Sequence, residues 1–316
     1  MQAVSAVVSH LRAQMSKVIV GQSAMLDQCL LALLCRGHAL LEGVPGIAKT
    51  LTIKALAGAL RLQFQRVQAT SDLMPADILG TNVLNMATST FAFHAGPVFT
   101  DLLLVDEINR MPPRTQAALL ECMEEQQVTV DGARHPLSAF FTVFATQNPI
   151  EFEGTYPLPE AQLDRFLLKI NVAYPSAREE AQILSRFQQG FDSHDLSPLG
   201  LEALDPALLA RAREEIRTGI RVEESLFDYV VRVVRGTRES PALTLGASPR
   251  AAVFLMQTAK AMAALDARDY IIPDDVKGAA LPVLRHRVLL KPEAELEGLS
   301  PDQIIQDLLR TIEVPQ

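Results

Sequence analysis

Short apolar runs alternate with helical patterns over the first 172 residues, and this alternation constrains the fold more than any other feature of the chain. The runs are HALLE (38–42), LLLVDE (102–107), FFTVFAT (140–146) and FLLKINV (166–172). Helical patterns accompany them over 23–36, 48–61, 113–125 and 160–164. Runs this short and this apolar are typical of strands buried on both faces. The alternation therefore predicts a doubly wound α/β layer with a parallel sheet.

The pattern changes after residue 175. Helical periodicity continues over 177–189, 206–216, 222–238, 248–265 and 273–285, without apolar runs between these segments. We therefore expect an α/β domain over 1–175, a boundary region over 176–195 and a helical domain over 196–316.

Two stretches interrupt the alternation in the first half. Residues 72–99 have neither helical nor strand periodicity, although their second part resembles a hairpin. Residues 127–139 centre on Asp131–Gly132, a strong signal for a tight turn between strands. Both stretches are expected to be hairpin inserts rather than parts of the core.

Composition narrows the class of protein. A hydrophobic fraction of 48% and a charged fraction of 21% are ordinary for a soluble globular chain. The net charge of -8 argues against a protein that coats nucleic acid. The N-terminus lacks the pattern of a secretory signal, and no apolar run is long enough to span a membrane. Cys29, Cys35 and Cys122 fit buried thiols. We expect a cytoplasmic protein.

The segment EGVPGIAKT (42–50) lies between a predicted strand and a predicted helix, which is the context of a phosphate-binding loop. It matches G-x-x-x-x-G-K-[ST], except that Ala48 replaces the last glycine. Gly43 and Gly46 would permit a tight turn that directs N–H groups at phosphate oxygens. Lys49 would bridge the β- and γ-phosphates, and the Thr50 hydroxyl would ligate Mg²⁺. The positive end of the following helix would favour the same anion.

Two later strand ends carry polar residues to the edge where open α/β sheets place ligands. LLLVDE ends in Asp106 and Glu107: Asp106 would hold Mg²⁺ through water, and Glu107 would polarise an attacking water. FATQNP (144–149) brings Asn148 to the same edge, where it would bond to the γ-phosphate or the attacking water. Each feature alone fits an ordinary turn, but their order after the loop favours a nucleotide site.

Two arginines suit the dispersed charge of a phosphoryl group in transfer, Arg165 and Arg250. Either one alone would more simply be a surface ion-pair partner. Ser248 and Pro249 fit the N-cap and first residue of a helix, so Arg250 lies in its first turn. From there it would move with the helical domain over a bound nucleotide.

Together these features resemble the AAA+ ATPases, and more narrowly the MoxR family. The matching segments, in chain order, are VIVGQ (18–22), EGVPGIAKT (42–50), GPVFTDLLLVDEINRMPPRTQAALLECMEE (96–125), FATQNPIEFEGTYPLPEAQLDRF (144–166), GASPRA (246–251) and IIPDDVKGAALPVLRHR (271–287). The similarity covers roughly residues 18–290. It implies a five-stranded parallel sheet flanked by helices, followed by a small helical lid.

The resemblance implies ATP and Mg²⁺ as cofactors. Thr50 and Asp106 would hold the metal. The residues that the resemblance places at the nucleotide are Val20, Gly21, Gly43, Pro45, Gly46, Ile47, Ala48, Lys49, Thr50 and Leu51. Val20 and Gly21 would lie near the adenine. Ala48 would be tolerated because the last glycine of the pattern lies at a helix-compatible junction, where we expect a negative φ.

The catalytic residues implied by the resemblance are Glu107, Asn148, Arg165 and Arg250. Glu107 would be the catalytic base, Asn148 the first sensor and Arg250 the second. Arg165 would be an arginine finger that reaches a neighbouring subunit's site. The two hairpin stretches match inserts that commonly face the pore of the ring.

The function implied is Mg-dependent ATP hydrolysis coupled to remodelling or maturation of client protein complexes. The partners would be further copies of the chain in a ring, usually a hexamer, client proteins, and a separate protein with a von Willebrand factor A domain. A P-loop kinase and a nucleotide-gated scaffold with little hydrolysis remain alternatives. A nucleic-acid remodeller is disfavoured by the acidic charge.

Overall fold

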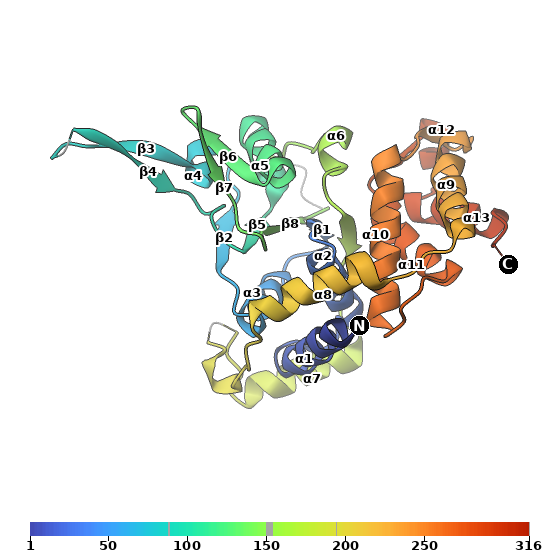
Figure 1. Cartoon of the computed structure of the whole chain (residues 1–316), viewed down its shortest axis with the longest axis horizontal. Helices are drawn as coiled ribbons and strands as arrows, with labels where there is room; N and C mark the ends of the chain where they lie inside the picture. The colour runs from blue at the N-terminus through green and yellow to red at the C-terminus, as the bar shows by residue number, and fades with distance from the viewer. Residues whose placement is uncertain (88, 150–153, 194, 316) are drawn as a thin grey trace.

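The computed structural model describes residues 1–87, 89–149, 154–193 and 195–315 (Figure 1). Residues 150–153 belong to the segment 144–166, which resembles the MoxR family, and lie outside the described residues. A five-stranded parallel sheet forms the centre of the first half, with strand order β2-β5-β8-β1-β9. Its strands are β1 (Ala39–Glu42), β2 (Phe64–Gln68), β5 (Leu102–Asp106), β8 (Thr142–Gln147) and β9 (Leu168–Asn171). This sheet, with helices around it, confirms the expected α/β fold.

The central strands are buried because successive side chains enter two different hydrophobic clusters. Leu41, Leu102 and Leu104 face one cluster, which contains apolar residues of three helices, α1 (Gln2–Val18), α2 (Ser23–Leu34) and α3 (Lys49–Ala59). Leu40 and Leu103 face the other, which contains the apolar stripe of α5 (Pro113–Glu125). Burial on both faces explains why these strands are apolar throughout rather than alternating.

Helices cover both faces of this sheet. The helical elements of the first half are α1 (Gln2–Val18), α2 (Ser23–Leu34), α3 (Lys49–Ala59), α4 (Pro75–Leu79), the 3-10 turn η1 (Ile108–Arg110), α5 (Pro113–Glu125) and α6 (Glu160–Leu163). Within the described residues, no helix is both long enough and apolar enough to span a membrane.

Each of the two irregular stretches contains an antiparallel hairpin. The strands are β3 (Gly80–Asn85) with β4 (Thr90–Ala95), and β6 (Gln127–Val130) with β7 (Ala133–Pro136). The β3–β4 hairpin projects from the end of the molecule that lies farthest from the C-terminus (Figure 1). The ring of Phe93 stacks on His135 with 4.0 Å between centroids, and this contact joins the two hairpins.

The second half is mainly helical. Its helical elements are α7 (Ala177–Gln188), the 3-10 turn η2 (Ser197–Leu199), α8 (Pro206–Gly219), α9 (Glu224–Glu239), α10 (Pro249–Leu265), α11 (Pro273–Leu284), α12 (Pro292–Leu296) and α13 (Pro301–Thr311). It also contains a two-stranded antiparallel sheet, β10 (Leu243–Leu245) and β11 (Leu289–Leu290), so it is not wholly helical. Helix α8 packs against α1 of the first half.

A buried arginine joins the helical part to the sheet. Arg287 follows α11, and its side chain is 1% exposed. Its Nε lies 2.7 Å from Oδ1 of Asp164, and its Nη2 donates to the carbonyl oxygens of Asp164 and Phe166. The hydroxyl of Ser248, at the start of α10, donates to the other oxygen of Asp164. Asp164 and its neighbours are therefore fixed by two elements of the helical part.

Candidate functional site

The segment predicted to bind phosphate leaves β1 and turns into α3. Gly46 has a φ of +85°, and a Cβ built on it would have open space around it. At Gly43 the constraint is close packing, because a Cβ there would lie 2.7 Å from the carbonyl oxygen of Val172. The two glycines are thus required for different reasons, one for its backbone angle and one for its lack of a side chain.

The explanation for Ala48 from a negative φ is wrong. Ala48 is the N-cap of α3 and has φ 64° and ψ 20°, in the left-handed region. Its carbonyl accepts bonds from both the amide and the hydroxyl of Thr52, each at 2.9 Å. The backbone therefore adopts the conformation that the glycine of the general pattern would adopt, and alanine holds it at a cost of roughly 1–2 kcal/mol.

Lys49 and Thr50 open α3 beside the sheet edge. The Lys49 ammonium donates to the carbonyl oxygens of Gly43 and Val44 and has no carboxylate among its hydrogen-bond acceptors in the described residues. Burial lowers its pKa, against the attraction of Asp106, Glu107 and Glu42. The ammonium is thus held at the loop by neutral oxygens, and an anion placed there would restore a full counter-charge.

Asp106 ends β5 and is 7% exposed. Its Oδ2 lies 3.5 Å from the Thr50 hydroxyl, and its Oδ1 accepts a bond from Thr146 at 3.2 Å. Arg66, on the neighbouring strand β2, places its Nε 2.6 Å from the same Oδ2. Arg66 is not among the predicted site residues, because β2 is not among the predicted strands.

Glu107 follows Asp106 with a φ of 58°, and its amide donates to the hydroxyl of Thr146 at 3.0 Å. Its carboxylate accepts a bond from Gln68 at 3.2 Å and forms an ion pair with Arg110 at 2.9 Å. Both partners stand beside the sheet edge, one on β2 and one on the turn after β5. The carboxylate of Glu107 is therefore engaged by the protein itself.

A cavity of about 690 Å³ brings most of the predicted residues together. Those that line it are Pro45, Gly46, Ala48, Lys49, Thr50, Leu51, Asp106, Glu107 and Asn148, joined by Arg66, Gln68 and Thr146. Ile183 and Phe187 of α7 line it on another side. Val20 and Gly21 are outside this lining; a Cβ on Gly21 would come within 2.3 Å of Glu179 Oε1, at the start of α7.

The donor set fits a nucleotide phosphate with a divalent cation. The start of an 11-residue helix, a glycine turn and an ammonium face one space, which suits a phosphate. A hydroxyl and a buried carboxylate 3.5 Å apart are oxygen ligands of the kind that Mg²⁺ prefers. Arg66 already places a positive charge at that carboxylate, so a metal ion bound there would have to displace the guanidinium.

Arg165 and Arg250 do not line this cavity. Both bind Glu124 near the end of α5: Arg165 at 2.8 Å and Arg250 at 2.5 Å. The hydrogen bond from Arg250, and with it the one from Arg165, holds the pKa of Glu124 below its ordinary value. The two arginines border a separate hollow that also contains Glu124. The structure thus divides the predicted catalytic residues into two groups.

Comparisons with known proteins give the same assignment. A model of the ATPase family associated with various cellular activities (AAA) matches residues 38–168, and an AAA lid domain model matches residues 235–308. The chain is 44% identical to "Uncharacterized protein YeaC" of Bacillus subtilis, over 95% of this chain and 92% of that protein. It is 43% identical to "Chaperone MoxR1" of Mycobacterium tuberculosis, over 96% of this chain and 81% of that protein. The chain belongs to the MoxR family of AAA+ ATPases.

A solved structure agrees with this membership. A crystal structure of a candidate ATPase from Cytophaga hutchinsonii superposes on this MoxR-family chain with a TM-score of 0.90 at 39% identity. The match covers 100% of this chain and 98% of the other. The fold and the order of its two parts are therefore those of a solved relative over the whole length.

Four residues that sequence reasoning missed contact the predicted site residues of this MoxR-family ATPase. They are Arg66, Gln68, Arg110 and Glu124. No local signal marked Arg66 and Gln68, since QFQRVQ lacks strand alternation: its apolar residues, Phe64 and Val67, are three positions apart. Arg110 and Glu124 had none, because their partners are determined by the path of the chain in three dimensions.

Proposed function

We propose that this ATPase binds Mg²⁺–ATP in the 690 Å³ cavity and couples its hydrolysis to the remodelling or maturation of client protein complexes. The observation that carries the proposal is the convergence of Lys49, Thr50, Asp106, Glu107 and Asn148 on that one cavity. Their arrangement supports phosphate binding, metal coordination and orientation of a water within a single space.

Each residue has a distinct task in this proposal. Lys49 and the amides at the start of α3 bind the phosphates, and Thr50 with Asp106 would hold Mg²⁺, which neutralises charge on the phosphates. Asn148 orients the γ-phosphate or the water. Glu107 accepts the proton of the attacking water, so its carboxylate must first leave Gln68 and Arg110.

Arg165 and Arg250 act on a neighbouring subunit's nucleotide in the proposed assembly. They lie outside the cavity of their own chain, and Glu124 holds both guanidinium groups on one surface. That arrangement supports a ring, which we propose is a hexamer, in which one subunit completes the site of the next. Arg250 would then serve as a second sensor between subunits rather than over its own nucleotide.

The client role draws support from a relative whose name, "Chaperone MoxR1", states a chaperone. We therefore propose a chaperone-like activity in the cytoplasm, with clients reached through a separate protein that carries a von Willebrand factor A domain. Affinity capture with Glu107→Gln in the presence of ATP tests this. Recovery of such a partner supports the proposal, and recovery of nucleic acid instead would contradict it.

Turnover by the purified chain, without any added phosphate acceptor, tests the hydrolytic part. Lys49→Ala should lose nucleotide binding, whereas Glu107→Gln should bind ATP and turn it over at least a hundredfold more slowly.

Arg165→Ala mixed with Lys49→Ala should recover activity, because some interfaces then combine an intact loop with an intact arginine. Arg310→Ala, an exposed arginine of α13, is the control and should need no complementation. Tight ATP binding without turnover would favour a scaffold.

A further inference from the structure

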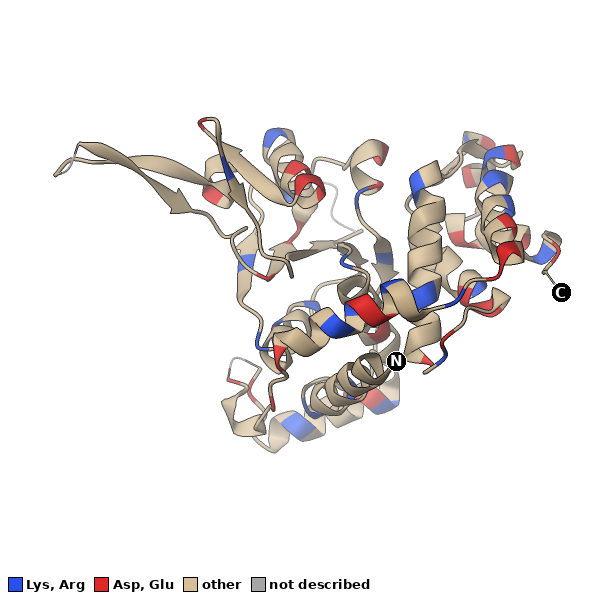
Figure 2. Cartoon of the chain, in the orientation of Figure 1, with Lys and Arg blue, Asp and Glu red and all other residues tan. Residues whose placement is uncertain are grey.

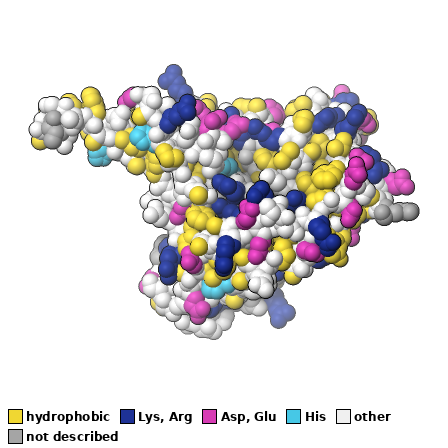
Figure 3. Space-filling view, in the orientation of Figure 1, with side chains coloured by type: hydrophobic (Ala, Val, Ile, Leu, Met, Phe, Trp, Pro, Cys, Tyr) yellow, Lys and Arg dark blue, Asp and Glu magenta, His cyan; other side chains and the backbone are white. Residues whose placement is uncertain are grey.

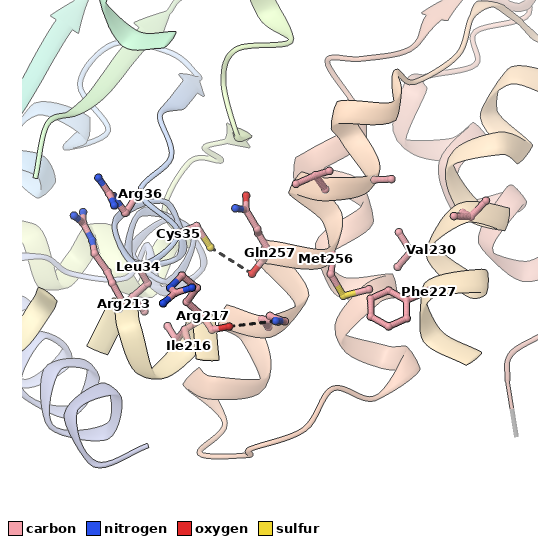
Figure 4. A pocket seen from close by; sticks show the side chains of 14 residues that line it. Leu34, Cys35, Arg36, Arg213, Ile216, Arg217, Phe227, Val230, Met256 and Gln257 are labelled. Atoms are coloured by element: carbon pink, nitrogen blue, oxygen red, sulfur yellow. Dashed lines mark hydrogen bonds between the residues drawn. The ribbon is translucent and has the colours of Figure 1, made fainter. Parts of the chain in front are cut away.

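A second pocket, of about 510 Å³, lies between the α/β part and the helical part. Its walls come from the end of α2 and from α8 on one side, and from α9 and α10 on the other (Figure 4). Figure 3 shows the corresponding face, where Lys and Arg side chains gather beside hydrophobic ones. The pocket shares none of its lining residues with the nucleotide cavity. Its volume is in the range of small-molecule sites.

The charge in this pocket is of one sign. Arg36, Arg213, Arg217 and Lys260 line it, and the lining contains no aspartate or glutamate. Within the described residues, Arg217 is bound to Glu214, whereas the other three cations form no ion pair with a carboxylate. Figure 2 shows the basic residues along α8 and α10, the helices on either side. Uncompensated positive charge is unexpected in a chain whose net charge is -8.

Of the four basic residues that line the pocket, Arg213 would be stabilised most by a bound counter-ion. It is 9% exposed, and its buried Nη2 has no hydrogen-bond partner among the residues that the structure describes. Its other nitrogens donate to the carbonyl oxygens of Leu33 and Ala139, at 2.8 and 3.1 Å, which supply no negative charge. Burial, and after it the charge of Arg36, lowers the pKa of Arg213 to about 10. A buried cation with an unmet donor and a second cation beside it would be stabilised by a bound anion.

The opposite wall is apolar. Phe227, Val230, Val231, Val253 and Met256 line it from α9 and α10. Three of these are about half exposed: Phe227 at 51%, Val231 at 47% and Val253 at 57%. Between the two walls, Cys35 donates to the carbonyl of Gln257, and burial raises the pKa of its thiol to about 12. The thiol is therefore neutral and adds nothing to balance the arginines.

We infer that this pocket binds an amphiphilic anion, a small molecule with one carboxylate or phosphate group on an apolar chain. The head group would lie at Arg36 and Arg213, and the chain would lie against the half-exposed side chains of α9 and α10. Both walls would stabilise such a molecule: the basic wall by charge-assisted hydrogen bonds to the head group, and the apolar wall by burial of the chain's apolar surface. A neutral hydrophobe would gain from only one of them.

The bound molecule would also bridge two parts of the chain. α10 begins at Pro249 and carries Arg250 in its first turn, and the same helix supplies Val253 and Met256 to the pocket. Occupancy would hold α10 against α2 and α8. The ligand would therefore restrict motion of the helix that carries Arg250.

Calorimetric titration of the purified chain without nucleotide tests the inference. The probes are decanoate, decyl phosphate, decanol and decyltrimethylammonium, each below its micelle-forming concentration. Both anions should bind at one molecule per chain, at least tenfold more tightly than decanol, and the cation should not bind. The ratio between decanoate and decyl phosphate decides which head group the site prefers. Equal affinity for decanol and decanoate would overturn the inference, as would absence of binding by both anions.

Variants locate the site. Arg36→Gln should weaken decanoate binding about tenfold while leaving decanol unchanged. Val253→Asp should abolish both. Arg211→Gln, an exposed arginine on α8 outside the lining, and Leu296→Asp, 89% exposed on α12, are the controls and should bind as the parent does. If the controls weaken binding as much as the pocket variants, the molecule binds elsewhere and the inference fails.

Discussion

Two residues of the candidate nucleotide site, Ala48 and Glu107, hold left-handed backbone conformations that L-amino acids seldom adopt. Ala48 has a φ of 64° and Glu107 a φ of 58°. Each lies just after a strand of the central sheet or at the start of the next element, where the chain must reverse within a few residues. Strain of roughly 1–3 kcal/mol at such a residue persists only where surrounding bonds determine the conformation. Here Thr52 and Thr146 supply those bonds.

Ala48→Gly should stabilise the chain. Glycine adopts the left-handed region without steric cost, and a glycine N-cap costs little, so we expect the free energy of unfolding to rise by about 1 kcal/mol. Urea unfolding measures this. Ala55→Gly, in the interior of the same helix, is the matched control and should destabilise by about 1 kcal/mol or more. Equal destabilisation by the two substitutions would show that Ala48 is unstrained.

Arg66→Gln should make the stability of the chain depend on Mg²⁺. Without the guanidinium, the carboxylate of Asp106 stays nine-tenths buried with no cation paired to it. The free energy of unfolding should fall by about 2 kcal/mol, which is less than for a fully buried ion pair because Arg66 is half exposed. Millimolar Mg²⁺ should restore part of the loss in Tm without nucleotide. Arg110→Gln removes a cation from Glu107 instead and should show no such response. A response shared by both variants would contradict a specific role for Arg66.

At the scale of elements, the junction around Asp164 connects the helical part to the residue proposed as the arginine finger. Arg287 bonds the carbonyl oxygens of Asp164 and Phe166, which flank Arg165. It also packs on the ring of Phe254 in α10, with 4.9 Å from guanidinium carbon to centroid. Because α10 carries Arg250 as well, the spacing between the two arginines depends on this junction.

Arg287→Lys should slow turnover more than it weakens nucleotide binding. An ammonium cannot reproduce the fork of bonds to several carbonyl oxygens, so we expect kcat to fall at least tenfold with little change in KM. The cost in stability should be about 2–4 kcal/mol. Arg285→Lys, two residues earlier and paired with Asp302, is the control. A large loss of stability with unchanged kcat would assign Arg287 a structural task alone.

The sequence predicted the apolar strands and most helices, because burial on both faces leaves a clear pattern. It did not reveal β2 by its own pattern, since Arg66 and Gln68 are exposed on an edge strand where only Val67 is buried. The helix α1 was not predicted, nor was α13. For α13 a signal was present: Ser300, Pro301 and Gln303 form an N-cap sequence, and the structure shows the capping bonds.

The sequence allowed prediction of the residues that follow strand ends in the candidate site, but not of the contacts between segments that are distant in the chain. Lys49, Thr50, Asp106, Glu107 and Asn148 follow strand ends, so topology alone places them together. The pairing of Arg165 and Arg250 on Glu124 depends on how the helical part packs, which no local pattern encodes. The conformation of Ala48 was predicted wrongly because helix propensity was applied to a residue that caps the helix from outside it.

At the scale of the whole molecule, a buried histidine connects the central sheet to α5. His38 is 5% exposed; its Nδ1 accepts from the amide of Val143 at 2.9 Å, and its Nε2 lies 3.2 Å from the carbonyl of Met123. Accepting at one nitrogen and donating at the other requires the neutral ring. Burial lowers the pKa of His38 to about 4 from 6.5.

Acid should therefore destabilise the fold before its carboxylates protonate. Between pH 6.5 and 4 the unfolded chain binds a proton that folded His38 does not, so stability falls as pH falls, by about 3 kcal/mol over the window. Buried His286, whose pKa is also lowered, adds in the same direction. Urea unfolding from pH 7 to 5 measures the slope. His38→Asn can still accept the bond from Val143 without titrating and should reduce the slope, whereas His94→Asn on exposed β4 should not; equal slopes would contradict the assignment.

The shared acid Glu124 has a consequence for assembly under the proposed function. A subunit that receives a neighbour's phosphates at Arg165 and Arg250 must release one anion to accept another, so the interface forms by exchange rather than by new pairing of free charges. The number of ion pairs changes little in an exchange. Added salt should then weaken the ring less than its many charges would imply. Removing the Glu124 carboxylate should make subunits associate more readily at low nucleotide concentration. It should also make their association depend more steeply on ionic strength.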